Sequence, residues 1–119
     1  MQAADPALAV PLPFATEVRY LEQTTVVALS GDLTSEDIGE LRRLIIALVD
    51  DDRPTVVLDM SHLRELDPAS VGVIIEARRY LLARGGDLVL RAPVPGYFRV
   101  LAHWMREGGF AIEDAPPVE

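Results

Sequence analysis

Residues 56–75, VVLDMSHLRELDPASVGVII, decide the fold predicted for this chain. The apolar and β-branched run that starts at residues 55–58 is typical of a strand covered on both faces. A polar loop at residues 61–67 follows, and a helix then begins near Asp67. The Asp67 carboxylate can cap the first free amides, and Pro68 suits the first helical position, where a missing N–H costs nothing. We therefore expect a strand, loop and helix, with the functional surface at the start of that helix.

The length and composition of the chain exclude several kinds of site and partner. A chain of 119 residues fits one domain with a substantial core. It has no cysteine, which excludes disulfides, thiolate metal sites and cysteine nucleophiles. Its formal net charge is −8 and every basic residue is an arginine, so its surface should repel nucleic acid and anionic membranes.

Both ends of the chain are predicted to lie outside the folded domain. The N-terminal segment is acidic and rich in proline, unlike a signal peptide, and no apolar run is long enough to cross a membrane. We expect a flexible arm over residues 1–15, a folded domain over residues 16–113 and a flexible tail over residues 114–119. A cytoplasmic location is expected.

An antiparallel hairpin and a helix are predicted upstream of the central strand. Residues 17–22 and 26–29 have strand patterns, with room for only a tight turn between them. Residues 31–34 then turn into a helix over residues 35–49. The residues that suggest its capping box are Thr34 and Asp37, and its apolar stripe consists of Ile38, Leu41, Ile45 and Leu48.

Two further helices and two strands are predicted downstream. The second helix covers residues 68–84 and ends at Gly85-Gly86, which suits a left-handed C-cap. A strand over residues 87–91, a third helix over residues 96–107 and a short strand over residues 110–112 follow. The residues that the second helix should bury are Val71, Ile74, Ile75, Leu81 and Leu82.

This alternation of strands and helices predicts an α/β fold. Helices of such length between strands imply right-handed crossovers and a mainly parallel sheet. We expect one domain with a mixed, mostly parallel sheet of four to five strands, an antiparallel hairpin strand at its N-terminus, and three or four helices. The loops at residues 31–34, 61–67 and 91–96 should gather at one end of the sheet, where open α/β folds usually bind their ligands.

The order of these motifs resembles the STAS domain family, and within it the bacterial anti-sigma factor antagonists. The resemblance covers residues 16–113. LSGDL at residues 29–33 resembles the family's Gly-Glu-Leu-Asp turn, and VVLDMS at residues 56–61 resembles its Val-Leu-Asp-Leu-Ser strand end. The order and spacing of two further segments also resemble the family: the helix start at residues 67–74 and Gly85-Gly86.

The resemblance implies a regulatory protein without catalysis of its own. Antagonists of this family bind an anti-sigma factor that is also a serine kinase, and the kinase ends the binding by phosphorylating a serine at the start of the second helix. A phosphate there meets free amides and the positive end of the helix dipole, but it adds nearly two negative charges to the contact surface. The partner-binding residues implied here are Asp32, Leu33, Asp67, Pro68, Ala69 and Ser70.

The sequence departs from the family at this switch. The usual Asp-Ser-Ser-Gly-Leu-Gly is DPASVG at residues 67–72, so Ala69 stands at the phosphorylated position and cannot accept phosphate. Three interpretations of Ser70 remain: a local hydrogen bond in the first helical turn, a shifted phosphorylation site, or a permanent partner contact. Asp67 is likewise a helix cap or a partner contact.

Two classes of function stay open. The first is a protein-binding module whose partner is an anti-sigma factor/serine kinase or another regulatory protein. Within this class, the chain could instead be a STAS subunit of a larger assembly, a transporter accessory or stress complex, that needs no switch. The second class is a nucleotide or lipid binder. The sequence contains no nucleophile–base pair, metal cluster or phosphate loop, so we predict no catalytic residue, metal ligand or cofactor, and a homodimer stays open.

Overall fold

The computed structural model describes residues 12–48, 54–91, 109 and 111–113. Its elements in chain order are β1 (Ala15–Leu21), β2 (Thr24–Leu33), the 3-10 turn η2 (Ser35–Asp37), α1 (Ile38–Leu48), β3 (Thr55–Leu66), α2 (Ala69–Leu82), β4 (Asp87–Arg91) and β5 (Ala111–Glu113). The strand order in the sheet is β1-β2-β3-β4-β5, with β1 antiparallel to β2 and all other neighbours parallel. The predicted α/β fold with a mixed, mostly parallel sheet is confirmed. The predicted third helix, over residues 96–107, lies outside the described residues.

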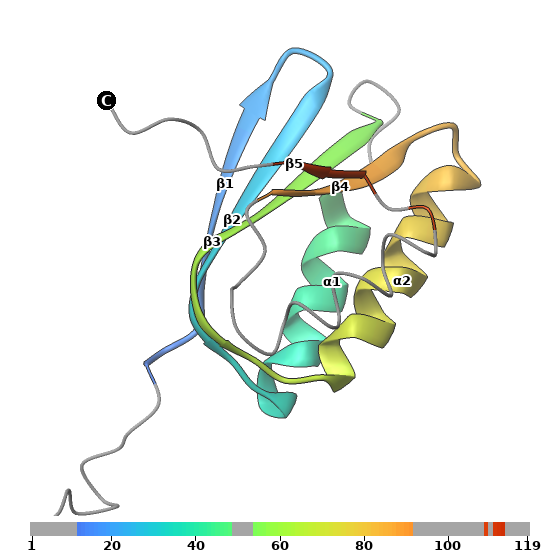
Figure 1. The fold of residues 1–119 in the computed structure, drawn as a ribbon. Helices are drawn as coiled ribbons and strands as arrows, with labels where there is room; N and C mark the ends of the chain where they lie inside the picture. The colour runs from blue at the N-terminus through green and yellow to red at the C-terminus, as the bar shows by residue number, and fades with distance from the viewer. Residues whose placement is uncertain (1–11, 49–53, 92–108, 110, 114–119) are drawn as a thin grey trace, which may run out of the picture.

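The two helices pack beside each other on one face of the sheet (Figure 1). Three residues of the predicted apolar stripe of α1 are buried: Leu41, Ile45 and Leu48. They face alternate residues of the sheet, among them Val27, Leu29, Val56, Leu58, Met60, Leu88 and Leu90. Because each fully buried aliphatic side chain stabilises the fold by about 1.5–3 kcal/mol, this layer fixes the position of both helices.

The end of α1 nearest the carboxyl ends of the strands is capped as predicted. One oxygen of the Asp37 carboxylate accepts hydrogen bonds from the Thr34 N–H at 3.1 Å and from the Thr34 hydroxyl at 2.9 Å. The first turn is a 3-10 turn, so the α-helix proper begins at Ile38 rather than at residue 35.

Two segments predicted as loops are strands instead. β2 continues through Gly31 to Leu33, and β3 continues through Ser61 to Leu66. The pairing between them shifts twice, between Ala28 and Ser30 and again between Gly31 and Asp32. These bulges break the two-residue period, so the buried Leu63 and Leu66 stand three residues apart and their strand pattern is hidden in the sequence.

The helix α2 buries a different stripe from the one predicted. Ile74 and Leu81 are buried as expected, and Ser70, Val73 and Ala77 join them. Val71 and Ile75 are only half-buried, and Leu82 is exposed, because the buried stripe of α2 consists of residues about one position earlier in the sequence than predicted. The helix α2 ends at Leu82, two residues before the predicted end, and Gly85 follows with φ of +82°, the left-handed conformation predicted there.

One buried polar group on β2 lacks a partner. Thr25 is fully buried, and its Oγ1 has no hydrogen-bond partner in the described part of the chain. An unpaired buried hydroxyl destabilises a fold, whereas an apolar group of the same shape does not.

We therefore expect Thr25→Val to raise the free energy of unfolding by about 1 kcal/mol, as measured by urea unfolding. Thr55→Val is the matched control, because Thr55 is only half-buried at the start of the neighbouring strand. An unfolding free energy that stays at or below the wild-type value in Thr25→Val would contradict this assignment.

Candidate functional site

The starts of both helices lie at the carboxyl end of β2 and β3 (Figure 1). The two strands end level with each other, with Leu33 paired to Leu66. The next amide, that of Asp67, donates a hydrogen bond to the Leu33 carbonyl at 2.8 Å. This bond continues the pairing of β2 and β3 up to Asp67, two residues before α2, and fixes where α2 can begin.

Asp67 holds the first turn of α2. Its Oδ1 accepts a hydrogen bond from the Ala69 N–H at 2.8 Å, and its carbonyl accepts one from the Ser70 N–H at 2.9 Å. Pro68 already has helical dihedral angles, φ −54° and ψ −29°. The predicted roles of Asp67 as cap and of Pro68 as a residue that needs no N–H partner match this geometry.

The six predicted contact residues differ in exposure. Pro68 and Ala69 are exposed and Asp67 is half-buried, so these three can touch a partner. Asp32, Leu33 and Ser70 are buried. Asp32 and Leu33 lie beneath the surface because they belong to a paired strand rather than to the loop that we expected.

The hydroxyl of Ser70 is not available at the surface. The residue is 0% exposed, and its Oγ donates a hydrogen bond to the Asp67 carbonyl at 2.6 Å. A kinase could reach this hydroxyl only if the first turn of α2 opened. Of the three interpretations of Ser70, the geometry favours the local hydrogen bond.

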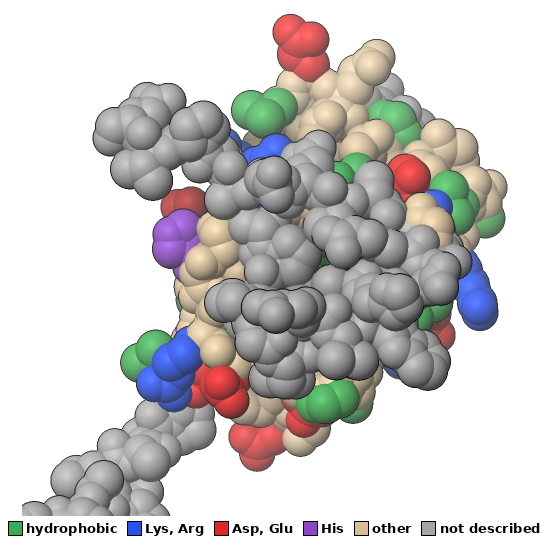
Figure 2. All heavy atoms as spheres, in the orientation of Figure 1, with side chains coloured by type: hydrophobic (Ala, Val, Ile, Leu, Met, Phe, Trp, Pro, Cys, Tyr) green, Lys and Arg blue, Asp and Glu red, His purple; other side chains and the backbone are tan. Residues whose placement is uncertain are grey.

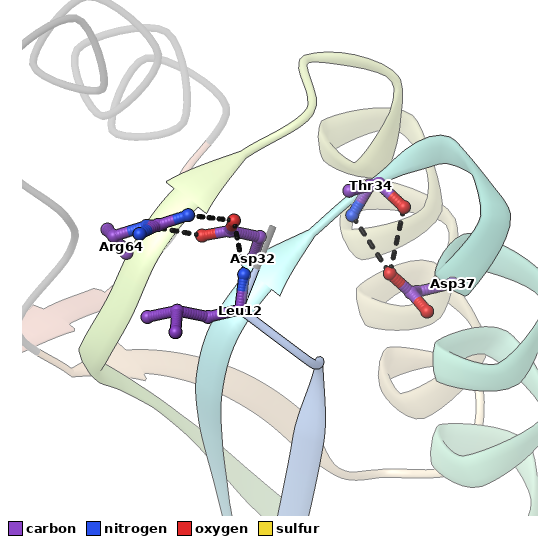
Figure 3. A network of polar contacts seen from close by, with 5 residues as sticks. All are labelled: Leu12, Asp32, Thr34, Asp37 and Arg64. Atoms are coloured by element: carbon purple, nitrogen blue, oxygen red, sulfur yellow. Dashed lines mark hydrogen bonds and ion pairs between the residues drawn. The ribbon is translucent and has the colours of Figure 1, made fainter. Parts of the chain in front are cut away.

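Arg64 is a residue of this end of the sheet that sequence reasoning missed. Its Nε donates a hydrogen bond to Asp32 Oδ1 at 2.9 Å, and its Nη2 donates a second to Oδ2 (Figure 3). The Asp32 side chain is 5% exposed and that of Arg64 is 51% exposed. A buried carboxylate needs a cation or several hydrogen-bond donors nearby. The sequence did not predict that Arg64 is this cation, because the two residues come together only in the bulged register of β2 and β3.

A segment of the predicted N-terminal arm joins the same network. Leu12 donates its N–H to Asp32 Oδ2 at 2.9 Å, and its carbonyl accepts the Asp32 N–H at 3.1 Å. Gly31 makes room for this crossing, because a Cβ there would lie 2.0 Å from the Pro13 carbonyl oxygen, and its φ is +80°. Leu12 is thus held against the sheet, although it falls within the arm predicted to be flexible.

The electrostatics of this pair keep both groups charged. The Arg64 hydrogen bond holds the pKa of the Asp32 carboxyl below its ordinary value, with a smaller contribution from the Leu12 amide, while burial opposes the shift. The same hydrogen bond raises the pKa of Arg64.

The surroundings of the helix starts are acidic. Glu36 and Glu65 are exposed, and Asp37 and Asp67 are half-buried. Figure 2 shows acidic side chains at the lower end of the molecule, where Figure 1 places the starts of α1 and α2. This surface suits contact with a basic rather than an acidic partner.

A hollow of about 430 Å³ lies on the sheet away from the helix starts. Its polar lining includes Glu17, Arg19, Asp59, His62 and Arg91. Within the described ranges, no group of three or more histidine, aspartate or glutamate side chains could hold a metal ion. No helix in those ranges is long and apolar enough to span a membrane.

We expect Asp32→Asn to lower the thermal unfolding midpoint at neutral pH, because it removes the buried carboxylate charge that pairs with Arg64. The folded-state pKa of Asp32 lies below the ordinary 3.8, so the pair stabilises the fold above that pH. The stabilisation is lost as the pH falls through the lower, folded-state pKa. The midpoints of wild type and Asp32→Asn should therefore converge in acid.

Glu76→Gln is the matched control. It breaks the Arg42–Glu76 ion pair, whose atoms are 3.1 Å apart but whose side chains are 52% and 64% exposed. Such exposed pairs contribute about 0–1 kcal/mol, so this variant should change the unfolding midpoint little at any pH. Equal effects of the two substitutions at neutral pH would contradict the role assigned to Asp32.

Comparison with known proteins agrees with this architecture. A family model described as "Mlab, STAS domain" matches residues 16–111. The phosphorylated form of the Bacillus cell fate determinant SpoIIAA superposes with a TM-score of 0.71 at 23% identity, covering 86% of this chain and 92% of that chain. An anti-sigma factor antagonist from Mycobacterium paratuberculosis gives 0.72 at 22% identity, covering 89% and 88%.

A membrane protein also contains a similar fold. The murine solute carrier 26 family member A9 anion transporter matches with a TM-score of 0.61 at 17% identity, over 71% of this chain and 14% of that chain. No curated protein sequence matches the chain. At these identities the solved structures establish the shared fold, while the family model covers most of the chain. The chain belongs to the STAS domain family.

Proposed function

We propose that this chain is a non-catalytic regulatory module that binds another protein through the start of α2, in the manner of an anti-sigma factor antagonist. The observation that carries the proposal is the exposed, rigid turn of Pro68 and Ala69, held from below by the Asp67 hydrogen bonds. A partner that docks on a preformed turn loses little conformational entropy on binding. Asp67 lies at the edge of this contact, and Asp32, Leu33 and Ser70 support it from beneath.

The proposed partner is an anti-sigma factor/serine kinase or another regulatory protein. The acidic side chains around the turn, Glu36 and Glu65 among them, favour a partner that presents arginine or lysine there. Both proteins would meet in the cytoplasm.

We further propose that phosphorylation does not switch this contact. Ala69 has no hydroxyl at the position that the family resemblance marks for modification, and Ser70 is buried and hydrogen-bonded. Binding would then be regulated by the concentration of the partner or by competition between partners, and not by a phosphate charge added at the turn.

A second candidate function is that of a STAS subunit in a larger assembly, such as a transporter accessory. The STAS-like part of an anion transporter favours it. This candidate uses the same unmodified turn, so it differs from the first in the partner and not in the surface. A nucleotide or lipid ligand in the 430 Å³ hollow is a third candidate, which a concentration-dependent rise in melting temperature would support.

We expect Ala69→Arg to weaken binding of the partner by about tenfold or more, because it places a long, positively charged side chain at the centre of the contact, opposite the basic groups proposed for the partner. Purified anti-sigma factor kinases and transporter subunits from the same genome serve as candidate partners, with affinity measured by calorimetry. Ala47→Arg is the matched control, since Ala47 is exposed on α1. Equal affinity of wild type and Ala69→Arg for a confirmed partner would show that the partner does not contact this turn.

Intact-mass measurement after incubation with a cognate kinase and ATP tests the absence of a switch. We expect no gain of a phosphate mass in the wild-type chain. A gain that disappears in Ser70→Ala would instead establish Ser70 as a shifted phosphorylation site and show that the first turn of α2 opens.

A further inference from the structure

The edge strand β1 is open on its outer side in the part of the chain that the structure describes. Its pairing partner there is β2 alone, and it forms the end of the sheet order (Figure 1). Five of its seven residues are exposed, including Tyr20 at 60% and Leu21 at 48%. Such an edge can accept another strand through its backbone N–H and C=O groups.

The hairpin geometry decides which residues offer those groups. The loop between β1 and β2 has two residues, and Leu21 pairs with Thr24 on either side of it. Two-residue hairpins close on a hydrogen-bonded pair, and hydrogen-bonded pairs alternate along an antiparallel ladder. Residues 15, 17, 19 and 21 therefore bond inward to β2, which leaves the backbone groups of the residues between them, Thr16 and Val18 among them, facing outward.

This alternation restricts how a second copy of β1 could pair antiparallel with the first. Outward-facing residues must be opposite outward-facing residues, so the centre of symmetry falls on a single residue of the strand. A centre at Glu17 places two glutamates opposite each other, and a centre at Arg19 places two arginines opposite each other. A centre at Val18 instead places Glu17 of each copy opposite Arg19 of the other.

The Val18 centre also uses the whole strand. Ala15 then lies opposite Leu21, so that the strand is aligned with its copy from one end to the other. Glu17 and Arg19 are exposed, and neither has an ion pair among the described residues. In this register they occupy non-hydrogen-bonded positions, where facing side chains come closest.

We propose that β1 is a self-association edge, through which two copies of this chain form a two-fold dimer centred on Val18. The dimer joins two sheets into one continuous sheet and forms two Glu17–Arg19 pairs across the interface. A seven-residue edge buries less area than a standard protein interface, so the dimer is weak and depends on concentration. It leaves the start of α2 outside the interface, because β1 and α2 lie at different parts of the fold (Figure 1).

Sedimentation equilibrium of the full chain over concentrations up to the millimolar range tests the proposal. We expect Glu17→Arg and Arg19→Glu each to weaken the dimer by about tenfold or more, because each places like charges opposite one another. An equimolar mixture of the two variants should dimerise again, since both arginines of one variant then face both glutamates of the other. Glu40→Arg and Arg43→Glu, exposed on α1, are matched controls that should leave the dimer unchanged.

Amide hydrogen exchange gives a second measurement that requires no variant. The Val18 amide should exchange more slowly at high than at low protein concentration, while the Glu17 amide should show no such dependence, because it already bonds to β2. A wild-type chain that stays monomeric at millimolar concentration would overturn the proposal. So would a dimer that both charge reversals leave intact.

Discussion

The pairing of β2 with β3 beyond their bulges is the constraint on which the site depends. Without the register shifts, Asp32 would not lie beside Glu65, and the Asp67 amide would not reach the Leu33 carbonyl. That last hydrogen bond holds Asp67, two residues before α2, against the end of β2, from which η2 and α1 also depart. One irregular stretch of backbone therefore positions both helix starts, and it also places the Asp32–Arg64 pair beneath them.

The large features of this arrangement could be predicted from the sequence because they rest on local rules. The apolar run of β3, the capping residues Thr34 and Asp67, and the left-handed Gly85 each act within a few residues of themselves. The features of the site that sequence reasoning missed are non-local. Arg64 and Asp32 are 32 residues apart in the sequence. They lie side by side because of β-bulges that the hydrophobic pattern of the two strands did not predict. Because of the same bulges, residues 61–66 lack the alternating pattern of a strand and were predicted as a loop. For the same reason Asp32 and Leu33 were expected at the surface.

This chain shares its fold with other members of the STAS family, but the turn at the start of α2 has features of its own. The fold is shared with antagonists and with part of an anion transporter, so the fold does not choose between those roles. The particular feature is a turn in which a proline and an alanine occupy the exposed positions while the remaining hydroxyl points inward. The exposed positions of this turn, Pro68 and Ala69, therefore carry no hydroxyl group.

Gly31 has a consequence for related sequences. The Leu12–Pro13 segment can cross the end of β2 only because residue 31 has no side chain, since a Cβ would overlap the Pro13 carbonyl. A relative with any other residue at this position must carry its N-terminal segment along a different route, and its aspartate at position 32 must then find another donor in place of the Leu12 amide. In this chain the identity of one residue thus determines whether the leading segment can close over the end of the sheet.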